Sequence, residues 1–430
     1  MSKNLVRFLT WLGMLVIFAG IPLFVWSLML PFGGRWSPES NAWRSLGQIS
    51  GLLGMSFFAG SLLLSVRTKF LDKLFGGLNF VYRDHHWLGT LGFCLLLVHP
   101  LALAYRFALQ SLAVAGNFLI PNPNDWSIFL GIVSLMLLMV LLVMTYFWRP
   151  TYHIWFLSHK FMALAYAIGW WHLLTIDSDV SRSLSLRWYY YLLGLASIAV
   201  IIYRVVGHRK LVPRATYSVD KISELTSGLW EIYLKAVTNP ISCHDGQFAF
   251  FTFINNHLRR DAHPFSIAGS NAQGGLRLII KALGDQTGNL GQLVNGDQVL
   301  VEGPYGSFGR QKDKKEIWIA GGIGITPFLS LACSRTNEES VVLIHTVAES
   351  AQNIFAKEFP NTISSSIKFI PWVSSTDGRL NAEAIEKVVS DWRERTILMC
   401  GPIPMMNSLR SQFMKLGGDK NKIISEDFNL

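Results

Sequence analysis

Histidines occur inside two strongly apolar segments, where an ionisable side chain is costly and usually functional. The first segment carries His85 and His86 near its start and His99 further along, and the second carries His159 near its start and His172 further along. If both segments cross a membrane in the same direction, His85 and His159 share one level and His99 and His172 share another. Two levels with two imidazoles each are what two bis-histidine haems require. Such haems carry single electrons, because no coordination position is left open.

Helical spacing supports this pairing. His85 and His99 are 14 residues apart, about 3.9 turns and about 21 Å of helix, so their rings leave nearly the same face. His159 and His172 are 13 residues apart, about 3.6 turns, so a bulge, a kink or a rotamer change must bring the second ring into phase. His86 is also 13 residues from His99 and remains a rival to His85, which helical phase favours.

Two other interpretations of these histidines are weaker. A single buried histidine often bonds only to neighbouring backbone or hydroxyl groups, but four that pair by level favour metal ligation. A zinc site fits less well, because the two levels lie too far apart for one ion and no Cys or carboxylate joins either pair.

The histidines belong to an apolar N-terminal half. The 430-residue chain is 50% hydrophobic and 15% charged, against roughly 25% charged residues in soluble domains, and residues 1–206 carry the deficit. A membrane span needs about 20 apolar residues. Six stretches qualify, at 8–30, 46–66, 87–107, 126–148, 158–176 and 187–206. They predict an all-α six-helix membrane bundle over residues 1–210. The first stretch is read as a span, since no small-residue cleavage site of a signal peptide follows it.

Basic residues beside the spans predict the orientation, because cytoplasmic loops carry the excess of Lys and Arg. One side carries 12 of them: Lys3, Arg7, Arg67, Lys69, Lys73, Arg83, Arg149, Lys160, Arg204, Arg209, Lys210 and Arg214. The other carries 5: Arg35, Arg44, Arg106, Arg182 and Arg187. We therefore expect an integral protein of the inner (plasma) membrane, with both termini and the C-terminal half in the cytoplasm.

The net charge of +10 reflects this topology and does not indicate a nucleic-acid partner. The four cysteines show no metal or disulfide spacing.

Residues 214–311 read as short strands with turn signals, which predicts a small soluble antiparallel β-barrel. The expected strands are 228–237, 246–254, 263–270, 275–283 and 297–306. In the third, Phe265 and Ser266 follow His263 and Pro264, and an aromatic followed by a hydroxyl at a strand end can cover a flavin and bond its edge. After Lys281, glycines and free amides can take a pyrophosphate.

From residue 313 to 430 the pattern changes to alternating strands and helices, which predicts an α/β nucleotide-binding domain. Residues 316–332 read as a strand, a glycine turn and a helix start. Gly321, Gly322 and Gly324 let the backbone approach a pyrophosphate, and the helix N-terminus adds its dipole. A second strand–turn–helix unit contains Cys400-Gly401-Pro402. A final strand is expected to return Glu426 and Phe428 to the domain interface.

Together these motifs resemble those of a known superfamily. The membrane half resembles the ferric-reductase-like transmembrane domain of NADPH oxidases and ferric reductases, and the soluble half resembles ferredoxin–NADP reductase modules, in a bacterial-type arrangement. The resemblance covers about 85–430 and rests on "HHWLG…HP", the fifth-span histidines, "HPFSIAGS", "GPYGSFG", "AGGIGITPFLS", "MCGPIPMM" and "EDF", in the family order. In that family a basic residue usually follows the first histidine of this span. This aligns His85 with the ligand and His86 with the basic residue.

The resemblance also implies roles for individual residues. Haem ligands would be His85, His99, His159 and His172. FAD contacts would come from His263, Pro264, Phe265 and Ser266 and, at the pyrophosphate, from Lys281, Gly288, Asn289 and Leu290. Nicotinamide-cofactor phosphates would lie at Gly321, Gly322, Gly324 and Thr326. The nicotinamide ring would lie by Cys400, Gly401 and Pro402, and Phe428 would stack on or near the flavin.

One position departs from the family pattern. NADPH-using relatives often place an Arg after the second strand, for the 2′-phosphate. This chain has Glu349 there, and a carboxylate suits a ribose diol better. The sequence therefore favours NADH over NADPH and leaves both open.

The sequence predicts an NAD(P)H-dependent flavocytochrome oxidoreductase that uses FAD and two haems b. Electrons would pass from cytoplasmic NAD(P)H through FAD and both haems to a small-molecule acceptor on the outer side, ferric chelate or oxygen. Arg35, Arg44 and Arg182 in the outer loops are either attractants for an anionic acceptor or solvated charges. The alternative is an electron-donating haem membrane subunit that feeds quinone or a periplasmic reductase partner. A membrane scaffold with a decayed reductase domain fits poorly with intact glycine turns.

Overall fold

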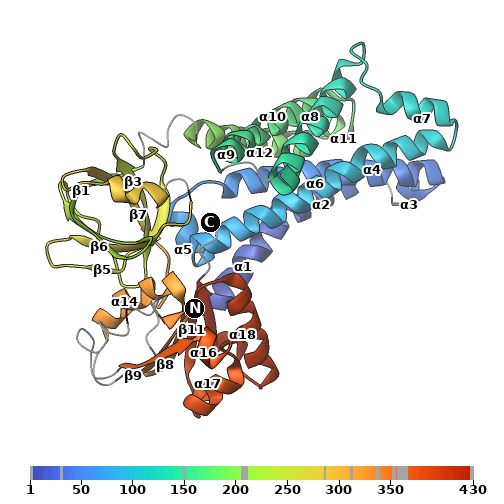
Figure 1. Cartoon of the computed structure of the whole chain (residues 1–430). Helices are drawn as coiled ribbons and strands as arrows, with labels where there is room; N and C mark the ends of the chain where they lie inside the picture. Colours follow the sequence, from blue (N-terminus) through green and yellow to red (C-terminus); the bar gives the residue numbers. More distant parts are fainter. Residues whose placement is uncertain are drawn as a thin grey trace. The chain divides into compact units, whose positions relative to one another are not determined.

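The computed structural model describes residues 3–29, 32–148, 152–204, 212–284, 287–309, 313–335, 339–350, 355 and 367–426. The chain divides into two compact units (Figure 1). One comprises residues 1–76 and 80–211 and is helical, and the other comprises residues 77–79 and 212–430 and contains all the described strands.

The helical unit consists of α1 (Lys3–Leu15), a π-helical turn (Val16–Gly20), α2 (Ile21–Ser27), α3 (Phe32–Trp36), α4 (Glu39–Leu64), α5 (Lys69–Phe75), α6 (Leu78–Ala108), α7 (Leu112–Leu119), α8 (Trp126–Val143), a second π-helical turn (Met144–Trp148), α9 (Tyr152–Lys160), α10 (Met162–Thr175), α11 (Asp179–Arg182) and α12 (Leu184–Ile202). Within the described residues, five helices are long and apolar enough to cross a membrane: Leu5–Ser27, Glu39–Leu64, Leu78–Ala108, Trp126–Trp148 and Leu184–Ile202.

The expected span at 158–176 is divided between α9 and the 14-residue α10. The helix is interrupted at Phe161. The Phe161 N–H donates to the Ser158 carbonyl at 3.0 Å, and the Leu164 N–H donates to the Phe161 carbonyl at 3.0 Å. Both bonds span three residues, which tightens the chain locally. This interruption lies between His159 and His172 and supplies the irregularity that their 13-residue spacing requires.

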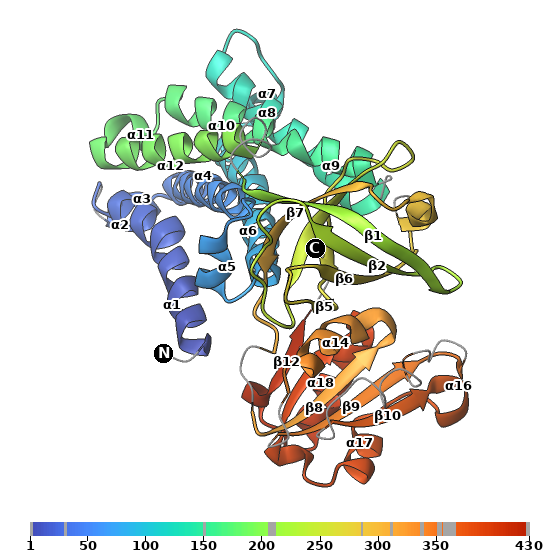
Figure 2. The same ribbon diagram turned by 90° about the vertical axis from the view of Figure 1, so that its left-hand side faces the viewer.

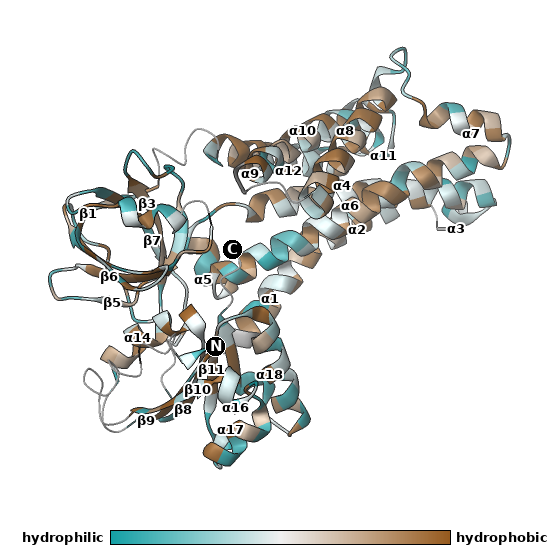
Figure 3. Cartoon of the chain, viewed as in Figure 1, coloured by the Kyte–Doolittle hydropathy of each residue, from teal (hydrophilic) through white to brown (hydrophobic). Residues whose placement is uncertain are grey.

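Apolar side chains cover the outside of this unit, and small residues lie between its helices. Figure 3 shows α8 and α10 as largely hydrophobic, and Val140 and Phe147 are 58% and 82% exposed. Between α4 and α6, a Cβ added at Gly92 would lie 3.1 Å from the Gly54 carbonyl oxygen. Close backbone approach through small residues is typical of helix packing in membranes.

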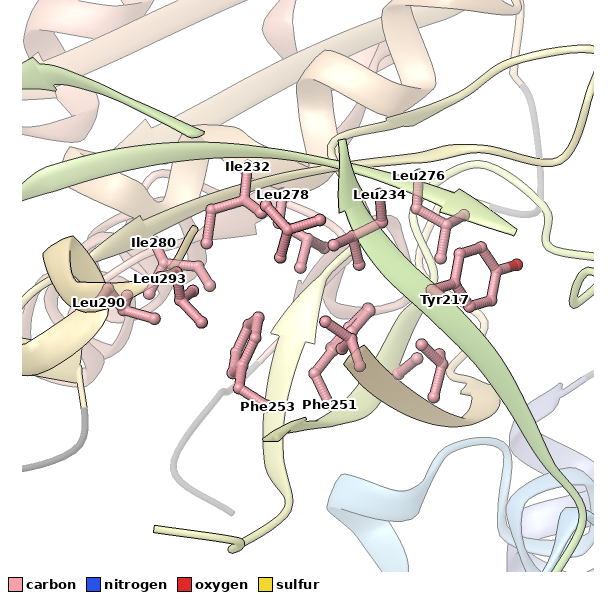
Figure 4. Close-up of a cluster of buried hydrophobic side chains, with 14 of the residues drawn as sticks. Tyr217, Ile232, Leu234, Phe251, Phe253, Leu276, Leu278, Ile280, Leu290 and Leu293 are labelled. Carbon is pink, nitrogen blue, oxygen red and sulfur yellow. The ribbon is translucent and has the colours of Figure 1, made fainter. Parts of the chain in front are cut away.

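The first half of the second unit is an antiparallel sheet. Its strands are β1 (Arg214–Thr226), β2 (Leu229–Ala236), β3 (Phe248–Ile254), β4 (His263–Ser266), β5 (Gly269–Ser270), β6 (Leu276–Lys281) and β7 (Gln298–Tyr305), in the order β4-β3-β7-β1-β2-β6-β5. Figure 4 shows its core, in which Phe251, Phe253 and Tyr217 meet the aliphatic side chains of β2 and β6. Each expected strand is present, except that the one expected over 263–270 is divided into β4 and β5, which pair with β3 and β6 at opposite edges of the sheet. The 13-residue β1 was missed, because charged residues interrupt its apolar alternation.

The second half is a parallel sheet of β8 (Lys315–Gly321), β9 (Ser340–Val347), β10 (Ile367–Val373), β11 (Thr396–Cys400) and β12 (Ile423–Glu426), in the order β10-β9-β8-β11-β12. The helices are α14 (Thr326–Cys333), α16 (Ser374–Asp377), α17 (Ala382–Val388) and α18 (Ile403–Lys415) (Figure 2). Alternate residues of β8 enter different cores: Trp318 packs with Phe328 of α14, and Ile319 packs with Leu409 of α18. Helices thus cover both faces, as in other doubly wound α/β domains.

Candidate functional site

His85 on α6 and His159 on α9 face each other across a cavity. Their ring centroids are 6.1 Å apart, and the cavity beside them has a volume of about 540 Å³. His86 also lines this cavity, with its ring centroid 5.6 Å from that of His85. The cavity wall is otherwise mostly apolar, with Lys160 and Arg204 among its few charged residues.

His99 on α6 and His172 on α10 form the second pair, with ring centroids 6.4 Å apart. The structure therefore brings the four sequence-predicted histidines together as the expected two pairs. Each pair combines one histidine from α6 with one from the α9–α10 segment.

The separations of the rings test whether the pairs fit a haem. Two imidazoles on opposite sides of one metal, with metal–nitrogen bonds of about 2 Å, have ring centroids about 6 Å apart. Both pairs have this spacing. Among the described residues, no group of three or more His, Cys, Asp and Glu side chains forms a metal site. A haem site needs no such cluster, because the porphyrin supplies the other metal ligands and two imidazoles from the protein are enough.

Three of the four rings are oriented by a hydrogen bond to backbone. The Nδ1 atoms of His85, His99 and His172 each lie 2.7 Å from a carbonyl oxygen, of Ser61, Gly47 and Ser127 respectively. An Nδ1–H that donates to a carbonyl fixes the tautomer and leaves Nε2 as the nitrogen available to a metal.

Glycines allow these rings to lie directly against a neighbouring helix. A Cβ at Gly51 of α4 would lie 2.6 Å from Nδ1 of His99, and one at Gly131 of α8 would lie 2.9 Å from Cε1 of His172. Sequence reasoning missed these supporting positions. A signal was present in the second span, where Gly47, Gly51 and Gly54 recur at helical spacing.

The outer-loop arginines are not equivalent. Arg35 is 3% exposed and pairs with Asp179 at 3.4 Å, and its guanidinium lies 3.6 Å from the Trp26 ring. The reading of Arg35 as an exposed loop charge is therefore wrong, because this side chain is buried in the helical unit. Arg182 pairs with Asp177 at 2.7 Å, and the hydrogen bond from Arg182 holds the pKa of Asp177 below its ordinary value. Arg44 is half-buried and has no carboxylate within 4 Å among the described residues.

In the antiparallel sheet, the expected flavin residues occupy β4. Ser266 is buried at the strand end. Phe265 is partly buried, with its ring centroid 6.2 Å from that of Phe251. Packing against the sheet core therefore holds the Phe265 side chain in position on one of its sides.

The expected pyrophosphate residues divide between a strand end and a 3₁₀ turn. Lys281 ends β6 and is exposed, and Gly288 and Asn289 lie in the turn Thr287–Gln292. Leu290 in the same turn is fully buried in the sheet core. Its side chain anchors the turn, which leaves only its backbone to face a ligand.

Two glycine turns meet where the parallel sheet reverses its strand order. Gly321 ends β8 and Gly401 follows β11, and a Cβ at Gly401 would lie 2.9 Å from the Gly321 Cα. A Cβ at Gly324 would collide with the Cys400 carbonyl oxygen. Gly322 has a φ of +54° and open space where a side chain would be. Ligands of doubly wound sheets bind at this reversal point, beyond the carboxyl ends of the strands.

Other residues stand at the same edge of the sheet. Thr326 begins α14, Pro402 directly precedes α18, and Cys400 is fully buried at the end of β11. Glu426 ends β12 and is buried. Phe428 lies outside the described residues.

Glu349 follows β9 by two residues and is exposed. Within β9 itself, His345 Nε2 lies 3.0 Å from the Gly322 carbonyl oxygen, which ties this strand to the glycine turn.

Family models match three segments of the chain. Residues 50–170 match the ferric reductase like transmembrane component, residues 215–308 an FAD-binding domain, and residues 318–411 the oxidoreductase NAD-binding domain. The chain therefore joins a ferric-reductase-like transmembrane domain to an FAD-binding domain and an NAD-binding domain. The combination is that of an NAD(P)H-dependent oxidoreductase. The matched transmembrane segment contains three of the four paired histidines, and His172 lies two residues beyond its end.

Curated relatives match part of the chain. Flavohemoprotein A of Dictyostelium discoideum is 26% identical over 236 residues, which are 49% of this chain and 59% of that protein. A probable dihydroorotate dehydrogenase B (NAD(+)) electron transfer subunit of Pyrococcus abyssi is 27% identical over 169 residues, 36% of this chain and 64% of that protein. The chain thus spans less than two thirds of either relative.

A solved structure is similar over about half of the chain. The flavohem-like FAD/NAD binding domain of nitric oxide dioxygenase from Vibrio cholerae O1 biovar El Tor is 20% identical, with 49% of this chain and 97% of that chain covered and a TM-score of 0.44.

Proposed function

We propose that the protein transfers electrons across a membrane, from cytoplasmic NAD(P)H to an acceptor on the outer side, with FAD and two bis-histidine b-type haems as its cofactors. The observation that carries this proposal is the pair of facing imidazoles at each of two levels, with centroids 6.1 and 6.4 Å apart. Bound FAD would accept a hydride and release single electrons, and bound haem would carry them one at a time.

The proposal assigns each domain a task. Residues 1–210 would bind both haems within six spans, of which α9 and α10 together supply the fifth. Residues 214–311 would form the FAD-binding barrel and residues 313–430 the NAD(P)-binding domain. The excess of Lys and Arg on one side supports a cytoplasmic location for both termini and for the soluble half.

His85 is proposed as the ligand on the cytoplasmic side in preference to His86. His85 is half-buried, and its Nδ1 lies 2.7 Å from the Ser61 carbonyl oxygen and 3.0 Å from the Ser61 Oγ. His86 is exposed. A ring held on its Nδ1 side presents Nε2 in a fixed direction, which a ligand needs.

The soluble residues would bind and orient the two nucleotides. Phe265 and Ser266, with His263 and Pro264, would contact the flavin, and Lys281 with the backbone of 288–290 would hold its pyrophosphate. Gly321, Gly322, Gly324 and Thr326 would present backbone N–H groups and a helix N-terminus to the phosphates of NAD(P)H. Cys400, Gly401 and Pro402 would border the nicotinamide, so that hydride transfer occurs away from bulk water.

Haem content tests the proposal directly. We expect about two b-type haems per chain, because one porphyrin iron takes two axial imidazoles. The pyridine haemochrome assay, combined with protein quantification, gives the ratio. A ratio near one would remove one histidine pair from this account.

The acceptor is tested separately. Full-length protein in nanodiscs is reduced with NADH or NADPH and then mixed with air, ferric citrate or a soluble quinone. Fast reoxidation by ferric citrate or air supports a small-molecule acceptor on the outer side. Reoxidation by quinone alone would instead favour an electron-donating membrane subunit.

A further inference from the structure

The four paired histidines differ in what holds them. Nδ1 of His85, His99 and His172 lies 2.7 Å from a backbone carbonyl oxygen. Nδ1 of His159 is buried and has no hydrogen-bond partner among the residues that the structure describes. One pair therefore has two hydrogen-bonded rings, and the other has only one.

An indole takes the place of the missing hydrogen bond. Trp155 lies four residues before His159 on α9, so the two side chains meet on one helix face. Their ring centroids are 5.3 Å apart and their planes are inclined by 26°, a stacked arrangement. Stacking fixes the plane of the imidazole, but unlike a backbone carbonyl it accepts no hydrogen bond from Nδ1.

The difference matters for a haem ligand. A carbonyl that accepts a hydrogen bond from Nδ1 makes the imidazole a more basic ligand, which stabilises ferric iron and lowers the reduction potential. The His99–His172 pair has two such bonds. The His85–His159 pair has one, and it therefore stabilises ferric iron less.

We propose that Trp155 is the positioning residue for His159, and that the haem between His85 and His159 has the higher reduction potential of the two. This inference rests on the haem ligation proposed above. An electron arriving from the cytoplasmic side would then reside mainly on the His85–His159 haem until an acceptor withdraws it from the other haem.

A spectroelectrochemical titration of the full-length haem-loaded protein in nanodiscs measures both potentials. His172→Ala removes a ligand of the other haem and so assigns the midpoints: the higher one is expected to persist. If the lower midpoint persists in His172→Ala, the proposed order is wrong. A wild-type haem ratio below two would instead overturn the ligation on which the inference rests.

The role of Trp155 is tested by a matched set. Trp155→Leu removes the stack, Trp155→Phe keeps an aromatic ring, and Trp188→Leu changes a tryptophan that is 57% exposed on α12. Trp155→Leu is expected to shift the higher midpoint and to broaden the low-spin electron paramagnetic resonance signal of that haem. The other two variants are expected to match the wild type.

Loss of the His85–His159 haem in a Trp155 variant is also informative. If Trp155→Leu loses this haem and Trp155→Phe retains it, the positioning role is supported. If both variants lose it, or if Trp155→Leu changes neither the midpoint nor the spectrum, Trp155 does not position His159. Reduction of a soluble dye by NAD(P)H through the flavin checks that each variant is folded.

Discussion

The His172 imidazole lies against the bare backbone of Gly131. A Cβ added at Gly131 would be 2.9 Å from Cε1 and 3.0 Å from Nε2 of the ring. One helical turn earlier on α8, the Ser127 carbonyl oxygen lies 2.7 Å from Nδ1 of the same ring. A single helix face thus sets both the position and the tautomer of this proposed ligand.

Gly131→Val should therefore displace His172 and weaken the haem that it binds. Changes to the groups that support a metal ligand typically cost about 10–100-fold in metal affinity, so we expect about one haem per chain instead of two. The haemochrome ratio measures this. Gly13→Val is the control, because no atom lies within 4 Å of a Cβ at that helical position. Two retained haems in Gly131→Val would show that α8 does not confine His172.

The histidine pairs could be predicted because they depend on two simple periodicities, the helical repeat and the inside–outside alternation of spans. The supporting contacts could not. The carbonyl of Gly47 carries no sequence signal for the ring of His99, since every residue has a carbonyl and only tertiary packing selects one. The buried pair Arg35–Asp179 was missed for the same reason: the two residues are 144 positions apart.

Cofactor preference is expected to depend on Glu349. If its exposed carboxylate binds the ribose diol, Glu349→Ala should raise kcat/KM for NADPH relative to NADH, because a negative charge near the 2′-phosphate is removed. Steady-state kinetics with both donors measure the ratio. Glu383→Ala, at an exposed position of α17, should leave it unchanged. A strong wild-type preference for NADPH would show that Glu349 does not have this role.

Gly322→Val should abolish electron entry. Gly322 has a φ of +54°, a conformation that β-branched residues rarely adopt, and its open side is where we expect phosphates to approach. Both dye reduction and outer-acceptor reduction by NAD(P)H should therefore fall, while bound FAD is retained.

A second glycine separates strain from blocked binding. Gly417 has a φ of +82° and also has open space around a Cβ, but it follows the C-terminal end of α18, away from the glycine turns. Gly417→Val should keep NAD(P)H oxidation. If both variants lose activity equally, backbone strain alone explains the loss at Gly322.

In the sheets too, local turns could be predicted from the sequence, whereas contacts between neighbouring strands could not. β8 and β11 are short apolar runs followed by glycine, so their turns could be predicted to serve a nucleotide. That Gly324 lies against the Cys400 carbonyl oxygen could not, because it depends on β8 and β11 being neighbours in the sheet. β1 was missed because the exposed Asp220, Lys221 and Glu224 interrupt its second half, although the alternate residues Ala215, Tyr217 and Val219 of its first half are buried.

His99→Ala should separate the two halves of the electron path. It removes one ring of the 6.4 Å pair and leaves the soluble unit unchanged, so NAD(P)H should still reduce a soluble dye through the flavin. Delivery to an outer acceptor should collapse, because about 21 Å of helix lies between the levels of His85 and His99.

His86→Ala is the matched control and should keep both haem signals if His85 is the ligand. Dye reduction, outer-acceptor reduction and the haem spectrum are measured for each variant in proteoliposomes. Full transmembrane reduction by His99→Ala would mean that no haem is bound between His99 and His172, and the pairing of histidines by level would have to be abandoned.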